Sequence, residues 1–179
     1  MRVIGGKYRG RVLVSFEGEA VRPTSDRVKE SLFNILSNRI YGTRVLDLFC
    51  GSGSLGIESL SRGASSVVFN DAAKTSVEIL RKNLQKLGVG KEATVSCRDY
   101  ALCLDVESGP FDLIFLDPPY AMDAGEKALK KIAQKGLLSP NGIAVYERDR
   151  LFEGEIEGLE TFDSRKYGKT YLTFFRVKQ

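Results

Sequence analysis

The chain has 179 residues, of which 42% are hydrophobic, so it is long enough to form one compact domain with a real core. It contains no run of about 18 apolar residues and no charged-then-apolar leader, so we expect a cytoplasmic protein without a membrane anchor. Histidine is absent, which excludes histidine general-base chemistry and histidine-ligated metals. The three cysteines show no CxxC spacing, so we expect neither a disulfide framework nor a metal site.

Positive charge is concentrated at the N-terminus. Residues 1–44 contain nine Lys and Arg against four Asp and Glu, a net of +5, whereas residues 45–179 contain eighteen against nineteen, a net of −1. Clustered basic residues typically contact phosphates, so this asymmetry suggests a basic arm that binds a polyanion. The alternative is a solvated surface hairpin with no partner.

The sequence predicts a hairpin in its first 20 residues and a helix in the segment that follows. Residues 2–14 contain two short β-prone runs around Gly5, Gly6 and Gly10, which predicts a small basic β-hairpin over residues 1–20. The following stretch, VRPTSDRVKESLFNIL, places Thr24 among candidate N-caps ahead of apolar residues at helical spacing. We therefore expect a helix of about three turns at the start of a main domain spanning residues 21–179.

From residue 43 onward, short apolar strands alternate with amphipathic helices. We expect strands at 44–49, 66–71, 94–97, 111–116 and 142–147, and helices at 55–62, 74–87 and 125–135. Two further strands, 160–162 and 171–177, lack a helix between them and predict an antiparallel hairpin at one sheet edge. The pattern indicates an α/β fold with a doubly wound, mainly parallel, seven-stranded Rossmann-like sheet.

Acidic residues follow four of the predicted parallel strands. Their positions are Asp47, Asp71, Asp99 and Asp117. Ligands of doubly wound sheets bind at the carboxyl ends of the strands, so these four side chains are expected at one rim. The alternative, that each is only a turn residue, does not explain four acids at equivalent positions.

The loop Gly51-Ser-Gly53-Ser-Leu-Gly56 matches the GxGxxG dinucleotide pattern, with Asp71 twenty residues after its first glycine. That pattern alone is weak evidence for a nicotinamide cofactor. Asp47 enters the same loop, and its carboxylate would repel a pyrophosphate but attract the ammonium and sulfonium of S-adenosylmethionine. We therefore favour S-adenosylmethionine, with the ribose hydroxyls at Asp71 and the adenine amine at Asp99.

The fourth strand runs directly into Asp117-Pro118-Pro119-Tyr120. An exocyclic aromatic amine is a weak nucleophile, and a carboxylate with a backbone carbonyl can accept its N–H hydrogens and orient its nitrogen. The prolines would hold this backbone rigid, and Tyr120 would stack on the base. No strong base is required, because the proton can leave after methyl transfer.

These segments together resemble a known family. The glycine loop, the following acid and DPPY are similar to class I amino-methyltransferases acting on adenine N6, guanine N2 or a glutamine amide. The flanks RVIGGKYRGRVL, RPTSDRVKESLFNIL, SLGIESLSRGA and RKYGKTYLTFF resemble bacterial 16S rRNA guanine-N2 methyltransferases of the RsmD type, from Arg2 to Phe175. The resemblance implies methylation of the guanine at position 966 of 16S rRNA, in an assembled or partly assembled small subunit.

Residue roles follow from the resemblance position by position. The expected cofactor contacts, for S-adenosylmethionine and its product S-adenosylhomocysteine, are Asp47, Phe49, Gly51, Gly53, Asp71, Asp99 and Thr24. The expected target-base residues are Asp117, Pro118, Pro119 and Tyr120, and the expected RNA contacts are Lys7, Arg9, Arg11, Arg22, Arg27 and Tyr167. One departure is that Asn70-Asp71 stands where the family usually has a glutamate.

Two other functions remain open at this point. An adenine-N6 nucleic-acid methyltransferase shares the motifs, although one acting on DNA normally carries a target-recognition insertion that no segment here is long enough to form. A non-catalytic RNA-binding protein on the same fold would tolerate damaged motifs, yet both the glycine loop and DPPY are intact. We expect a monomer, because no long exposed apolar segment argues for an obligate dimer.

Overall fold

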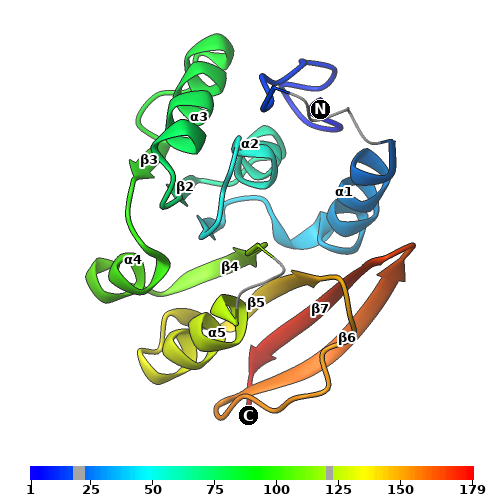
Figure 1. The fold of residues 1–179 in the computed structure, drawn as a ribbon, viewed down its shortest axis with the longest axis vertical. Helices are drawn as coiled ribbons and strands as arrows, with labels where there is room; N and C mark the ends of the chain where they lie inside the picture. The colour runs from blue at the N-terminus through cyan, green and yellow to red at the C-terminus, as the bar shows by residue number, and fades with distance from the viewer. Residues whose placement is uncertain (18–22, 120–122) are drawn as a thin grey trace.

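A seven-stranded sheet lies at the centre of the computed structural model, which describes residues 1–17, 23–119 and 123–179 (Figure 1). The strands, in chain order, are β1 (Arg44–Asp47), β2 (Ser66–Asn70), β3 (Ala93–Ser96), β4 (Phe111–Leu116), β5 (Leu138–Arg148), β6 (Leu159–Tyr167) and β7 (Thr170–Val177). The helices are α1 (Pro23–Ile35), α2 (Ser54–Ser61), α3 (Lys74–Leu87), α4 (Tyr100–Val106) and α5 (Ala124–Gln134), with a short 3-10 helix at Ser37–Arg39. This arrangement confirms the predicted fold class.

The order of the strands determines where a ligand can bind. Across the sheet they lie in the order β3-β2-β1-β4-β5-β7-β6. Strands β1 to β5 are mutually parallel, and β7 is antiparallel to both of its neighbours. The chain moves outward from β1 to β3 and then returns to β4 on the other side of β1. The crevice at such a reversal, beside the carboxyl ends of β1 and β4, is the usual ligand site of doubly wound sheets.

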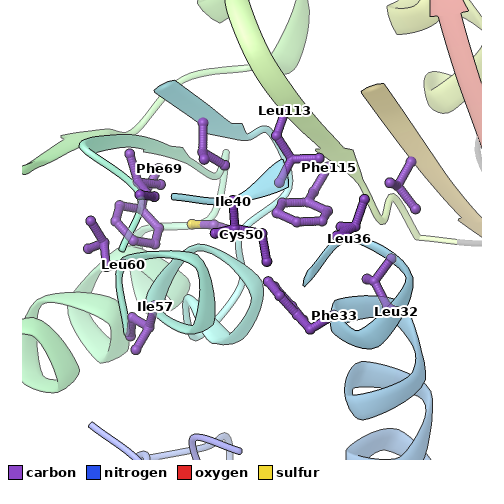
Figure 2. Close-up of a cluster of buried hydrophobic side chains, with 14 of the residues drawn as sticks. Leu32, Phe33, Leu36, Ile40, Cys50, Ile57, Leu60, Phe69, Leu113 and Phe115 are labelled. Carbon is purple, nitrogen blue, oxygen red and sulfur yellow. The ribbon is translucent and has the colours of Figure 1, made fainter. Parts of the chain in front are cut away.

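Two apolar cores cover the two faces of the sheet. The first lies under α1, α2 and α3, where Phe33 and Phe115 approach to 5.8 Å between ring centroids (Figure 2). The second lies under α4 and α5. In β4, Leu113 and Phe115 join the first core, whereas Ile114 and Leu116 join the second. Burial on both faces explains why β4 reads as a continuous apolar run.

The N-terminal segment forms less strand structure than the sequence predicts. Its only described pairing is one antiparallel bridge between Arg2 and Val12. Gly6 has a φ of 76°, and a Cβ added there would collide with the carbonyl of Ser61 in α2, so the turn lies directly on the helix. In place of a regular ladder, backbone N–H groups of this segment donate to Glu58 and Ser61 of α2. The proposed domain boundary at residue 20 lies outside the described residues and stays a prediction.

Several elements differ from the sequence-based expectation. The sequence did not predict α4, since this seven-residue helix leaves Leu102 and Val106 exposed and so lacks a clear apolar face. β5 begins four residues before Gly142, and its pairing with β4 shifts register between Phe111 and Leu113. The sequence predicted a strand only at 160–162, whereas β6 is nine residues long. Its charged residues fit in the strand because β6 lies at the sheet edge with one partner. Within the described ranges, no helix is long and apolar enough to cross a bilayer.

Candidate active site

A cavity of about 650 Å³ opens at the carboxyl ends of β1, β2 and β4. It brings together most of the residues that the sequence assigned to the cofactor and target base, namely Asp47, Phe49, Gly51, Asp71, Asp99, Asp117, Pro118 and Pro119. Tyr120 and Arg22 lie outside the described residues, as does the side chain of Thr24. Residues as far apart in sequence as Asp47 and Pro119 therefore meet at one rim, as the strand pattern predicts.

The glycine loop has the backbone conformation that close approach to a ligand requires. Gly51 and Gly53 have φ values of 53° and 88°, in the left-handed region that favours glycine. A Cβ added to Gly51 would meet only Phe16, at 4.0 Å from Cε2, so it would occupy cavity space. Gly53 does not line the cavity. It precedes α2 and turns the chain into that helix.

Asp47 is a buried acid at the base of the cavity. Its side chain accepts one hydrogen bond, from the backbone N–H of Gly56 at 2.9 Å, and has no ion pair among the described residues. Burial raises the pKa of Asp47 to about 7, and the charges of Asp117 and Asp71 add to this, while the Gly56 bond opposes it. A buried carboxyl that lacks a cationic protein partner fits a positively charged ligand.

Asp71 joins the end of β2 to the glycine loop. Its Oδ2 accepts from the N–H of Gly51 at 2.9 Å, and its Oδ1 accepts from the N–H of Ala73 at 2.9 Å. These bonds hold the carboxylate in one orientation, and each oxygen keeps a second lone pair for a ligand. Although an aspartate is one carbon shorter than the glutamate expected from the family, bonds to the backbone of Gly51 and Ala73 fix its carboxylate at the cavity.

Asp99 begins α4, where its Oδ1 accepts from the N–H of Ala101 at 2.8 Å. The next residue, Tyr100, packs against Phe49 with ring centroids 5.5 Å apart, and both rings line the cavity. The sequence reasoning missed Tyr100, although its position beside Asp99 was a usable signal. It also missed Phe16, which belongs to the N-terminal segment and lines the same cavity.

Asp117 lies where β4 ends, at the mouth of the cavity. Its side chain is open to solvent on the cavity side, yet the surrounding protein raises the pKa of Asp117 above that of an ordinary aspartate. A second acid, Glu147, lies at the end of the neighbouring strand β5 and was also missed. Its position at the carboxyl end of a parallel strand is the signal that points to it.

The residues assigned to RNA do not form one surface. Arg9 and Arg27 line an open groove of about 520 Å³ between the N-terminal segment and α1, together with Arg2. Lys7 instead faces Glu92, with 4.0 Å between Nζ and Oε1. Arg11 is exposed but does not line the groove, and the partly buried Tyr167 packs against the first core.

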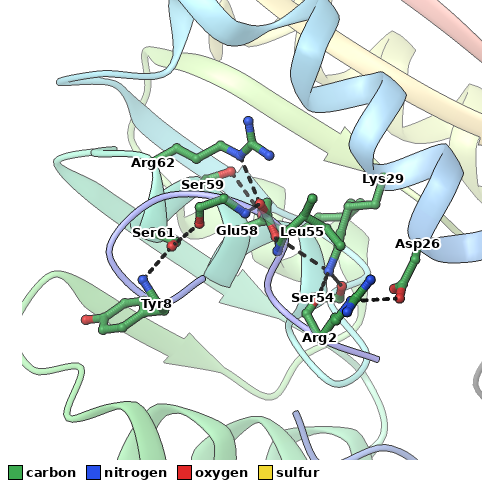
Figure 3. A network of polar contacts seen from close by, with 12 residues as sticks. Arg2, Tyr8, Asp26, Lys29, Ser54, Leu55, Glu58, Ser59, Ser61 and Arg62 are labelled. Atoms are coloured by element: carbon green, nitrogen blue, oxygen red, sulfur yellow. Dashed lines mark hydrogen bonds and ion pairs between the residues drawn. The ribbon is translucent and has the colours of Figure 1, made fainter. Parts of the chain in front are cut away.

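A buried carboxylate fixes the N-terminal segment to the sheet domain. Glu58 of α2 is fully buried and accepts from the backbone N–H groups of Ile4 at 2.9 Å and Gly5 at 2.8 Å. It also pairs with Arg62 at 2.9 Å and with the buried Lys29 at 3.5 Å (Figure 3). The basic segment is therefore an integrated part of the fold. Among the described residues, no group of three or more potential ligands is arranged to hold a metal ion.

The sheet order and the site at its switch point define the class I methyltransferase fold, and the comparisons with known proteins agree. The family described as conserved hypothetical protein 95 matches residues 1–176. Ribosomal RNA small subunit methyltransferase D of Haemophilus influenzae is 40% identical over 153 residues, which cover 84% of this chain and 79% of the relative. The putative rRNA methyltransferase YlbH of Bacillus subtilis is 41% identical, covering 99% of this chain and 100% of the relative.

Solved structures give the same result. The putative methyltransferase yhhF from Escherichia coli superposes with a TM-score of 0.89 at 27% identity, covering 99% of this chain and 98% of that one. The putative methylase HI0767 from Haemophilus influenzae gives a TM-score of 0.81 at 33% identity, covering 99% and 98%. The chain belongs to the conserved hypothetical protein 95 family, the RsmD-type methyltransferases, which confirms the family resemblance read from the sequence.

Proposed function

We propose that this protein transfers a methyl group from S-adenosylmethionine to the exocyclic N2 of a guanine in 16S rRNA, at position 966, within the small ribosomal subunit. The observation that carries the proposal is that the Asp117-Pro118-Pro119 segment borders the same cavity as the glycine loop. One relative named as a small-subunit rRNA methyltransferase and another named as a putative rRNA methyltransferase support the substrate class.

The residues of the cavity fit S-adenosylmethionine. The buried carboxyl of Asp47 suits a cationic ligand, and the space beside Gly51 suits one that approaches the backbone closely. Asp71 would accept from the ribose hydroxyls with its remaining lone pairs, and Phe49 and Asp99 would contact the adenine. When bound, S-adenosylmethionine supplies a methyl group made electrophilic by the attached sulfonium.

Asp117 would hold the target amine. Its carboxylate accepts N–H hydrogens from the guanine amine, which turns the nitrogen lone pair toward the methyl group and stabilises the positive charge that develops on nitrogen. Pro118 is buried and fixes the backbone after Asp117 against the protein, whereas Pro119 is exposed and accessible to a substrate. The stacking role of Tyr120 remains part of the proposal.

RNA would reach this site from the side of the N-terminal segment. Arg9 and Arg27 line one groove, and phosphate contacts by such residues position an RNA without reading its sequence. A base in a loop can be splayed into the pocket at lower cost than a paired base. The docked N-terminal segment would therefore contact both the RNA and S-adenosylmethionine, since Arg9 lines the groove and Phe16 lines the large cavity.

The direct test is transfer of tritiated methyl from S-adenosylmethionine to small subunits from a strain that lacks the modification, followed by nucleoside analysis. We expect label in N2-methylguanosine, and label in N6-methyladenosine would contradict the guanine assignment. Asp117→Asn should abolish transfer and keep S-adenosylmethionine affinity within severalfold. Asp105→Asn is the matched control, because its exposed pair with Lys131 contributes little to stability.

A further inference from the structure

Glu147 and Asp117 lie side by side at the ends of adjacent strands. Strands β4 and β5 are parallel, with Leu116 opposite Tyr146. The next positions are Asp117, directly after β4, and Glu147, near the end of β5. Residues in register on neighbouring strands point to the same face of a sheet. By strand alternation this is the face of Phe115 and Val145, which belong to the first core under α1.

Neither acid has a cationic partner in the described part of the chain. The nearest basic residue in sequence, Arg148, turns to the other face, where it pairs with Glu126 at 3.1 Å and lies over the ring of Tyr146 at 5.2 Å. Burial, and then the charge of Asp117, raises the pKa of Glu147 above that of an ordinary glutamate. Folding gains nothing from two adjacent acids without a cation, so their placement suits a ligand rich in N–H donors.

The space in front of Glu147 adjoins the target-base position. Glu147 lines a recess of about 10 Å³ together with Pro118, Pro119, Arg148 and Arg150, and the same two prolines border the large cavity. Glu147 is partly exposed and lies at the surface of this recess. A base whose amine is held at Asp117 would therefore turn its adjoining ring edge toward Glu147.

The ring edge next to the amine distinguishes the bases. In guanine, the N2 amine is adjacent to N1–H, which is a donor, whereas in adenine the N6 amine is adjacent to N1, which is an acceptor. A carboxylate acceptor therefore attracts the guanine edge and repels an unprotonated ring nitrogen. The DPPY motif alone contains no group that makes this distinction.

We propose that Glu147 is the residue that specifies guanine, by accepting a hydrogen bond from N1–H while Asp117 accepts from the N2 amine. This inference rests on the proposed function and deepens it. Glu147 acts on the choice of base and on its orientation, and the methyl transfer itself needs no proton transfer to it. In the protein without substrate, burial and then the charge of Asp117 oppose the ionisation of Glu147.

The test uses small subunits reconstituted with rRNA that carries either guanine or 2-aminopurine at the target position. 2-Aminopurine keeps the amine that is methylated but lacks the 6-oxo group of guanine, so its N1 is a bare nitrogen. The comparison with Glu147→Gln separates the N1 contact from any effect of the missing oxygen. We expect wild-type protein to prefer guanine in kcat/KM by about ten- to a hundredfold. In Glu147→Gln this preference should fall to within about threefold, because an amide can either accept or donate. Glu155→Gln, an exposed acid on the following loop, should retain the wild-type ratio.

Each result decides the inference. A Glu147→Gln protein that keeps the wild-type ratio overturns it, whatever the absolute activity, and so does wild-type protein that accepts 2-aminopurine as readily as guanine. The second measurement needs no variant and stands even if the substitution impairs folding. Wild-type protein that labels no guanine at all would refute the proposed function instead. Melting curves should place Glu147→Gln at or above wild type, and a lower melting temperature with an unchanged ratio would assign Glu147 a purely structural role.

Discussion

The side-chain amide of Asn83 holds the backbone of Val14 through a pair of hydrogen bonds. Its Oδ1 accepts from the N–H of Val14 at 2.7 Å, and its Nδ2 donates to the carbonyl of Val14 at 3.0 Å. The same Nδ2 donates to the carbonyl of Ser52 in the glycine loop at 3.0 Å. One buried side chain of α3 thus connects the N-terminal segment to the cofactor cavity.

We expect Asn83→Ala to destabilise the protein by about 2–3 kcal/mol, because it removes three hydrogen bonds whose backbone partners lie in a partly buried region. S-adenosylmethionine affinity should fall as well, since the Ser52 carbonyl no longer has its anchor. Urea unfolding and calorimetric titration measure the two effects. Asn34→Ala, an exposed change on α1, should alter neither. Unchanged affinity in Asn83→Ala would show that the loop does not depend on this side chain.

The buried ion pair of Glu58 and Lys29 leads to a second prediction, on the free energy of unfolding. Glu58→Gln should cost about 3–5 kcal/mol, because it removes the carboxylate that pairs with the buried Lys29 ammonium at 3.5 Å. The double variant Glu58→Gln with Lys29→Met should cost less than the sum of the two single changes, since both charges are then absent. Denaturant unfolding of the four proteins gives the coupling free energy. Strict additivity would mean that the two side chains act independently.

Much of the site could be predicted because each of its parts is local in sequence. Asp47 ends β1, and the glycine loop, Asp71, Asp99 and Asp117 come after the ends of strands, and a parallel sheet brings such positions to one edge. Glu147 also lies at the carboxyl end of a parallel strand, the fifth, so the same strand pattern could have predicted it. The positions of the strands therefore contained more information about the site than the familiar motifs did.

The role of the N-terminal segment could not be predicted in the same way. Its basic composition indicates an RNA partner but gives no sign that Phe16 lines the cavity or that Glu58 binds the backbone of Ile4. These contacts join residues that are far apart in the chain, and no periodicity encodes them. The groove containing Arg9 and Arg27 likewise depends on how the segment docks against α1.

The raised pKa of Asp47 predicts that S-adenosylmethionine binding depends on pH. With a pKa of about 7, the carboxyl is largely protonated below pH 7 and ionised above it. A cationic ligand prefers the ionised form, so affinity should rise as pH increases from 6 to 8, with proton release on binding. Calorimetry in buffers of different ionisation enthalpy measures both effects. Asp47→Asn should weaken binding and remove this pH dependence, and a dependence that persists in the variant would assign it to another group.

The Asp47→Asn variant also tests how much the buried carboxyl of Asp47 destabilises the folded protein. Because the folded-state pKa of Asp47 lies above its ordinary value, its ionisation opposes folding, and the penalty grows from about pH 4 until it levels off above pH 7. Asp47→Asn should therefore stabilise the protein without cofactor by a few kcal/mol at pH 8 and by less at pH 5. Thermal unfolding at the two pH values makes the comparison. Equal effects at both would mean that ionisation of Asp47 carries no penalty.

The groove between the N-terminal segment and α1 predicts which arginines bind RNA. Arg9→Glu and Arg27→Glu should each weaken binding to small subunits and reduce the slope of log K against log salt by about 0.7–0.9 for every phosphate that the variant no longer neutralises. Arg11→Glu should have a smaller effect, because Arg11 does not line the groove. Lys130→Glu on α5 changes the net charge equally on the opposite face of the sheet and controls for long-range electrostatics. If all four reversals weaken binding alike, the overall charge of the protein attracts the RNA and the groove does not position it.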